Sequence, residues 1–179
     1  ELGSIGDANR ISVPLADVPI DTQHAVLAAE DREFYEHGGF SPAGIGRAAE
    51  EIAASIEVLV ASRNTASKPI LTGFSQGGML SFALAVYHPT LLDLAVPVGG
   101  WLPPPLWPSA VPANPPRIVA LHGEIDAAVK FEPTRDAIGH LENLGWPVTL
   151  KPYPDVGHAI PPPVRRELYL QLQRGLENP

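Results

Sequence analysis

Cysteine is absent from this chain of 179 residues. Its absence excludes disulfide bonds, a thiolate nucleophile and zinc sites built on cysteine. Six histidines are present, but no pair of them combines metal-ligand spacing with a carboxylate. We therefore expect neither a metal nor a cofactor, and we expect no chemical role for His24, His88 or His140, which fall in helical or helix-end contexts.

Basic charge is also scarce. Lys and Arg number 12 against 20 Asp and Glu, so the formal net charge is −8, and the basic residues form no cluster. This distribution argues against a surface for nucleic acid or for an anionic membrane. No apolar run reaches membrane-spanning length, and no signal-peptide pattern stands at the start. We expect no membrane span and a cytoplasmic location.

Proline, by contrast, is abundant, with 21 residues, and many of them gather in residues 101–108, 111–116 and 161–163. Because proline fixes φ and lacks an N–H, these segments are predicted to be stiff surface connections. The hydrophobic share of 45% is enough for the core of one ordinary globular domain.

Strand-like and helix-like segments alternate from about residue 69 onward. Strands are expected near residues 69–74, 94–98, 117–121 and 148–153, and helices near residues 76–87, 133–144 and 164–176. This alternation predicts an α/β fold with a mainly parallel sheet of about four strands flanked by helices. Functional residues should then lie at the carboxyl ends of the strands.

A helical N-terminal segment is expected ahead of this sheet. Residues 22–36 are rich in Ala, Leu and Glu, and an edge strand is expected near residues 11–15. A further helix starts at Ser41 as N-cap with Pro42 at its first position. It carries a buried stripe at helical spacing: Ile45, Ala49, Ile52, Ile56 and Leu59.

The most informative segment is residues 70–78, in which an apolar strand runs into a G-x-S-x-G turn and then an Ala/Leu-rich helix. This is the context of a nucleophile elbow. Gly73 and Gly77 are predicted to let strand and helix approach closely. Ser75 is predicted to hold a strained backbone that lifts its hydroxyl above the sheet, next to the positive end of the helix.

An aspartate and a histidine follow in the order that this architecture uses. Asp126 and His158 each come after a β-like run. In this arrangement Ser75 attacks a carbonyl, His158 takes its proton and Asp126 holds the imidazole tautomer. The backbone N–H of Gln76 is expected to donate to the developing oxyanion. The alternatives are a turn-capping role for Asp126 and a plain surface-loop histidine for His158.

From about residue 50 to the end, the chain resembles the phospholipase/carboxylesterase (acyl-protein-thioesterase-like) branch of the α/β-hydrolases. The resemblance rests on residues 73–78, 121–129 and 153–158, which in that family hold the nucleophile, the acid and the general base. It implies a serine carboxylesterase acting on short-chain acyl esters or thioesters. Glu124 and Asp155 are nearby acids, but neither stands at the motif position.

Compared with a full member of that family, this chain is expected to have a truncated α/β-hydrolase fold. The early strands of a full member, and the His-Gly loop that supplies its second oxyanion amide, have no counterpart ahead of Ser75. Residues 37–40 echo an oxyanion loop: either Gly38 and Gly39 replace that amide, or they end a helix in the left-handed conformation. His122 is expected to support the acid loop by a hydrogen bond.

Residues 1–49 resemble the start of a bacterial peptidoglycan glycosyltransferase domain, as in bifunctional penicillin-binding proteins. The signature E-D-x-x-F-x-x-H-x-G is matched by Glu30, Asp31, Phe34, His37 and Gly39. In that family the residue at Glu30 is the catalytic base. The family's later motifs and its membrane anchor are not found in this sequence, so glycosyltransfer is only a remote alternative, and the chain looks like a chimera with its boundary near residues 49 and 50. A folded but catalytically silent fusion, an interaction module at most, is the rival prediction.

An acyl pocket is the last expected feature of the site. Phe74, Trp101, Leu102 and Trp107 lie next to the elbow or in the proline-stiffened segment that follows a strand. They either wall the pocket or cover the sheet.

Self-association is also expected, because a truncated sheet leaves the strand at residues 69–74 as an apolar edge. We predict a homodimer, with N-terminal segments exchanged between protomers as a further possibility. Residues 37–40 of one protomer would then approach Ser75 of the other.

Overall fold

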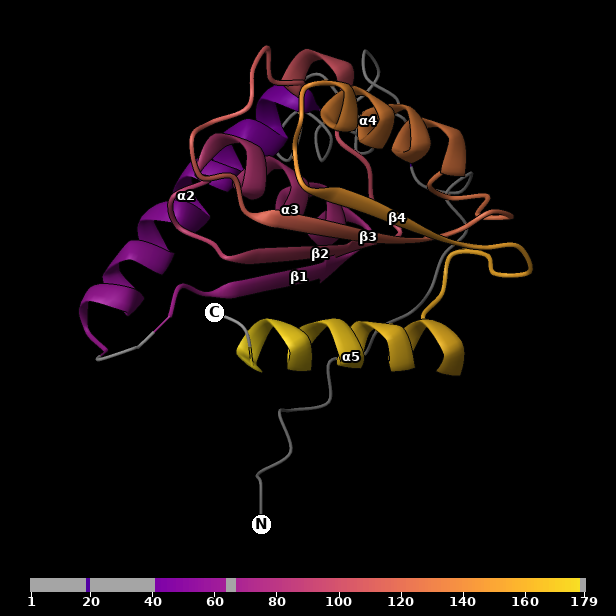
Figure 1. Ribbon diagram of the computed structural model, residues 1–179. Helices are drawn as coiled ribbons and strands as arrows, with labels where there is room; N and C mark the ends of the chain where they lie inside the picture. The colour runs from indigo at the N-terminus through magenta and orange to yellow at the C-terminus, as the bar shows by residue number, and fades with distance from the viewer. Residues whose placement is uncertain (1–18, 20–40, 64–66, 178–179) are drawn as a thin grey trace. The chain divides into compact units, whose positions relative to one another are not determined.

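The structure is a computed structural model that describes Pro19, residues 41–63 and residues 67–177 (Figure 1). The chain divides into two compact units, residues 1–41 and residues 42–179, and every element described below lies in the second. The predicted strand at residues 11–15, the helix at residues 22–36, the Glu30 signature and the loop at residues 37–40 fall outside the described residues.

Four parallel strands form one sheet in the order β1-β2-β3-β4. They are β1 (Ile70–Phe74), β2 (Leu94–Val98), β3 (Arg117–Gly123) and β4 (Val148–Tyr153). Phe74 is in register with Val98, and Val98 is in register with Leu121, so the carboxyl ends of the first three strands lie together. The predicted fold class is confirmed, and β3 is two residues longer than expected.

Helices cover both faces of the sheet: α2, α3 and α4 lie on one side and α5 on the other (Figure 1). They are α2 (Pro42–Ala61), α3 (Gln76–Tyr87), α4 (Phe131–Asn143) and α5 (Pro162–Glu177), with a short 3-10 turn, η2 (Pro104–Leu106). Helix α4 begins ahead of the predicted Pro133. Proline is tolerated there because the first N–H groups of a helix have no intrahelical partner.

Helix α3 occupies the centre of one layer. Its residues Met79, Phe82 and Ala83 have no exposed surface. Helix α2 packs against α3 and contributes Ala49 and Ala53 to the same core. Helix α3 is apolar on all sides. This composition suits a helix that is buried between a sheet and a second helix.

Helix α5 covers the opposite face of the sheet, where Val96, Val98 and Leu121 point toward it. The approach is closest at Gly175. A Cβ there would stand 2.7 Å from Cδ1 of Ile70 and 2.9 Å from Cδ2 of Leu94. Such separations are too short for real carbon contacts, so a larger residue at this position would require the ends of the Ile70 and Leu94 side chains to shift.

Strand β1 is an edge strand of the described sheet, as the sequence predicts. The N–H of Ser75 and the carbonyl of Pro69 both bond to the β2 side. Because successive residues of a strand alternate in direction, the N–H and C=O groups of Ile70, Thr72 and Phe74 face away from β2. Within the described sheet no strand pairs with these groups.

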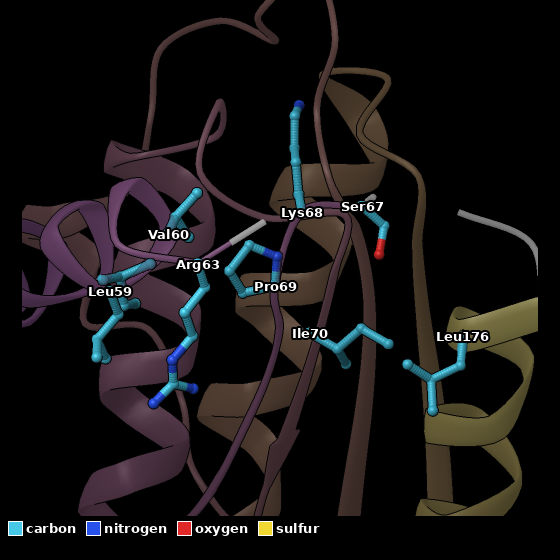
Figure 2. A pocket seen from close by; sticks show the side chains of 9 residues that line it. Leu59, Val60, Arg63, Ser67, Lys68, Pro69, Ile70 and Leu176 are labelled. Atoms are coloured by element: carbon cyan, nitrogen blue, oxygen red, sulfur yellow. The ribbon is translucent and has the colours of Figure 1, made fainter. Parts of the chain in front are cut away.

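The surface beside this edge is apolar. The α2 side chains Val58 and Leu59 are 69% and 49% exposed. A cavity of about 420 Å³ lies between the end of α2, the start of β1 and the end of α5. Leu59, Val60, Ile70 and Leu176 form its apolar walls, with Arg63 and Lys68 nearby (Figure 2). No helix in the described part of the chain is long and apolar enough to cross a membrane.

Candidate active site

Ser75 is the single residue between β1 and α3. Its backbone has φ 59° and ψ −118°, and it is the one described residue other than glycine with positive φ. A non-glycine residue in such a conformation costs on the order of 1–3 kcal/mol. The turn is held by a 2.9 Å bond from the Ser75 N–H to the carbonyl of Val98 and a 3.1 Å bond from the Met79 N–H to the carbonyl of Ser75. The predicted strained turn is therefore present.

The two glycines of the elbow have different roles. A Cβ at Gly73 would collide with the backbone of Gly77, so Gly73 must be glycine. The predicted close approach of strand and helix is therefore present between Gly73 and Gly77, but a Cβ at Gly77 itself would meet nothing within 4 Å, so the approach depends on Gly73 alone. A second close approach, between α3 and the end of β2, occurs at Gly78, whose Cβ would stand 2.8 Å from the carbonyl oxygen of Val98. Helix α3 thus crosses the sheet at Gly78.

The structure brings together Ser75, Asp126 and His158. Nε2 of His158 lies 3.0 Å from Oγ of Ser75, and Nδ1 of His158 lies 2.7 Å from Oδ2 of Asp126. Each side chain follows a different strand, β1, β3 or β4. The Asp126 side chain is 1% exposed and that of His158 is 25% exposed, so the line runs from a buried carboxylate to a partly accessible imidazole.

Asp126 combines the two roles that the sequence left open. Its Oδ1 accepts the backbone N–H groups of Ala128 at 2.9 Å and Val129 at 2.8 Å, which is a turn-capping arrangement. Its Oδ2 remains for His158. Three hydrogen bonds offset the loss of water around a buried carboxylate. The sequence gives no signal for these two amides, because a backbone donor does not depend on side-chain identity.

The alternative acids lie outside this arrangement. Glu124 and Asp155 are exposed, and neither forms a hydrogen bond or an ion pair with His158 in the described structure. The loops that carry Asp126 and His158 are in backbone contact: the Ile125 N–H donates to the carbonyl of Val156 at 3.2 Å, and a Cβ at Gly123 would collide with that carbonyl. Gly123 thus sets the spacing between the two loops.

The candidate oxyanion donors are only partly described. Gln76 is the first residue of α3, so its N–H has no partner within the helix and stands beside Ser75. Gly38 and Gly39, the expected source of a second donor, lie outside the described residues.

The four candidate pocket residues occupy different environments. The ring of Phe74 lies 4.6 Å from that of His158, tilted by 32°. Leu102 has no exposed surface and belongs to the core. Trp107 donates from Nε1 to the carbonyl of Leu102 at 2.8 Å and stacks on His140 of α4 at 4.6 Å. Trp101 is partly exposed. Of the four, Phe74 is the residue that the described structure places in contact with His158. The acyl pocket stays a prediction.

The other described histidines take structural positions. Nε2 of His122 lies 2.8 Å from the carbonyl oxygen of Val129, which is the predicted bond to the acid loop. His140 makes a similar bond to the carbonyl of Pro108, and His88 lies 3.4 Å from Glu50. His24 is outside the described residues. Within the part of the chain that the structure describes, no group of three or more His, Asp or Glu side chains is placed to hold a metal ion.

Two known families match parts of this sequence. The Phospholipase/Carboxylesterase family matches residues 30–170, and the Transglycosylase family matches residues 1–58. The second match agrees with a 51% identity over 47 residues to penicillin-binding protein 1A of Haemophilus influenzae, covering 26% of this chain and 6% of that protein. The two matched ranges overlap at residues 30–58, and α2 continues across the predicted boundary near residues 49 and 50.

Relatives of the larger match are named carboxylesterases, and one of them, from Oryza sativa subsp. japonica, is named a probable inactive carboxylesterase. A probable carboxylesterase from Oryza sativa subsp. japonica, Os04g0669500, is 33% identical over 132 residues, which are 70% of this chain and 47% of that protein. The chain therefore spans about half the length of this relative. The crystal structure of Arabidopsis thaliana SOBER1 superposes with a TM-score of 0.64 at 25% identity, covering 76% of this chain and 67% of that one. On these matches and on its fold, the chain belongs to the Phospholipase/Carboxylesterase family.

Proposed function

We propose that this chain is a serine carboxylesterase that hydrolyses short-chain acyl esters or thioesters. Ser75 is the nucleophile, His158 the general base and Asp126 the residue that orients His158. One observation carries the proposal: the side chains form a continuous hydrogen-bonded line of 3.0 Å and 2.7 Å although they come from three separate loops. The names of the carboxylesterase relatives support the same substrate class.

The geometry fits each step of acyl transfer. Asp126 accepts from Nδ1–H of His158, which leaves the Nε2 lone pair to receive the Ser75 proton. Oγ of Ser75 then bonds to the acyl carbon, and the carbonyl electron pair moves onto oxygen. When that intermediate collapses, His158 returns the proton to the departing alcohol or thiol. Water then attacks the acyl-enzyme with His158 again as base, and the free acid leaves.

Oxyanion stabilisation sets the expected rate. The proposed donor is the N–H of Gln76, the first residue of α3, where the helix dipole also favours negative charge. Loss of a single oxyanion donor typically costs about 10²–10³ in kcat. The expected second donor, at Gly38 or Gly39, lies outside the described residues, and we expect turnover to be slow if Gln76 acts alone.

A fluorophosphonate probe tests the proposal independently of the substrate. Such a probe phosphonylates a serine only when a neighbouring base activates it. We expect one adduct per chain by intact mass, located at Ser75 by peptide mapping. The variant His158→Gln should label far more slowly, and Ser81, buried in the same helix, should stay unmodified. Absence of labelling in the native protein would contradict the proposal and favour the catalytically silent alternative.

We also propose that the protein forms a homodimer through the open edge of β1. The backbone groups of Ile70, Thr72 and Phe74, which no described strand pairs, and the exposed side chains of Val58 and Leu59 support this assembly, because burial in a subunit contact would satisfy both. Ser75 directly follows β1, so the contact would place the site near the partner subunit.

Sedimentation velocity at low micromolar concentration should show a dimer. The substitution Leu59→Asp is expected to abolish it and to unfold the chain, because burial of this surface is inseparable from folding. Val111→Asp is the matched control, since Val111 is similarly exposed, at 38%, in the proline-rich segment. A stable, active monomer at that concentration would refute the assembly.

A further inference from the structure

A second imidazole lies against Asp126 without being part of the line to Ser75. His122 belongs to β3 and is 2% exposed. Its Nε2 lies 2.8 Å from the carbonyl oxygen of Val129 and 3.6 Å from Oδ2 of Asp126. Because a carbonyl can only accept, Nε2 must carry the proton and donate it. The other ring nitrogen, Nδ1, is buried and has no hydrogen-bond partner among the described residues.

The Val129 bond matters because Val129 also holds the carboxylate. Its N–H donates to Oδ1 of Asp126 at 2.8 Å, beside the N–H of Ala128 at 2.9 Å. These two donors fix Oδ1, and with Oδ1 fixed the direction of Oδ2 toward His158 is fixed as well. Any drift of Val129 would rotate the carboxylate and lengthen the 2.7 Å bond to Nδ1 of His158.

His122 is suited to hold Val129 because it is itself rigidly placed. It sits within the sheet, in register with Pro152 of β4. The ring of Phe131, at the start of α4, stands edge-on to it with centroids 5.8 Å apart. Through His122, strand β3 therefore anchors the turn at residues 126–129, which lies outside the sheet.

We propose that His122 is a positioning residue for Asp126. By donating to the carbonyl of Val129, it fixes the turn whose amides aim the carboxylate at His158, and its N–H adds favourable electrostatics 3.6 Å from Oδ2. This inference rests on the proposed esterase function, since positioning has a kinetic meaning only if His158 acts as a base.

Three substitutions separate the hydrogen bond from the bulk of the ring. His122→Gln keeps an N–H donor near the position of Nε2, whereas His122→Asn is polar but too short to reach Val129, and His122→Phe fills the space without a donor. For p-nitrophenyl acetate we expect kcat to fall by about 10–100-fold in the Asn and Phe variants with KM within about twofold, as for other second-layer partners of functional side chains. The Gln variant should retain most of the activity.

A double substitution distinguishes positioning from a general structural effect. If His122 acts through the carboxylate, then adding His122→Phe to Asp126→Asn should cost almost nothing further in kcat. A general structural role would instead multiply the two losses. Melting temperatures of all variants, measured alongside, show that each assay is made on folded protein.

Proton NMR supplies a readout that needs no turnover. The Nδ1–H of His158, bonded to Asp126, should give a far-downfield resonance in the native protein and in His122→Gln, and it should be lost or broadened in His122→Asn and His122→Phe. A native protein that shows this resonance but neither hydrolyses esters nor labels with the probe would refute the proposed function alone. If His122→Asn and His122→Phe both kept the native kcat and an unchanged resonance, the proposed role of His122 would be overturned.

Discussion

Replacing Ser75 with alanine is expected to lower the hydrolysis of p-nitrophenyl acetate and butyrate by about 10⁴-fold or more. Loss of the nucleophile in serine hydrolases leaves only the contribution of binding and of oxyanion stabilisation. The change removes one oxygen atom, and alanine meets the same backbone cost as serine at φ 59°. The fold should therefore survive, with an unchanged far-UV circular dichroism spectrum.

Ser81→Ala is the matched control for this measurement. Ser81 lies in α3, six residues after Ser75, and its Oγ donates to the carbonyl of Gly77 at 2.7 Å. That variant should keep its esterase activity, with at most a modest loss of stability from the missing side-chain bond. Equal rates for the native protein and Ser75→Ala would assign any observed hydrolysis to another group and refute the proposed function.

The substitution Asp126→Asn should reduce kcat by about 10⁴-fold while the chain stays folded. Oδ1 of Asp126 accepts two backbone N–H groups, so the carbonyl oxygen of an asparagine must occupy that place. Its NH₂ group then faces Nδ1 of His158, where it can only donate. His158 is forced to accept at Nδ1 and to carry its proton on Nε2. An Nε2 that already holds a proton cannot take the one from Ser75.

The pH–rate profile and a matched variant complete this test. A moderate rise in pH should not restore the rate of Asp126→Asn, because the variant holds His158 in the wrong tautomer and the charge of His158 is not the cause of the loss. Asp155→Asn, on the exposed loop that leads to His158, should leave kcat unchanged. A loss of activity in Asp155→Asn equal to that in Asp126→Asn would mean that the acid has been assigned to the wrong residue.

The sheet and the meeting of Ser75, Asp126 and His158 could be predicted from the sequence for a simple reason. Strands buried in parallel sheets are short apolar runs, so their ends can be found to within one or two residues, and ligands meet at those ends. Ser75, Asp126 and His158 each follow such a run, which is why their meeting could be expected before any coordinates.

The features that the sequence does not reveal depend on distances between separate elements. Gly77 and Gly78 are adjacent and chemically identical, yet only the crossing of α3 over Val98 decides which of them must lack a side chain. Leu102 and Trp107 stand in a segment that looks like a pocket wall, but the core and His140 occupy their side chains. Backbone donors such as the N–H of Val129 have no signature in residue type at all.

The packing of Gly175 has a consequence for the order in which the site can be assembled during synthesis. Ser75 stands at the end of β1, and β1 is held on one face by α5, which meets Ile70 at Gly175. Helix α5 leaves the ribosome after Ser75, Asp126 and His158 have all emerged. Until α5 has emerged, the face of β1 that it covers has no partner among the described elements. We therefore expect the three side chains to reach their final alignment only after α5 has packed over the strand.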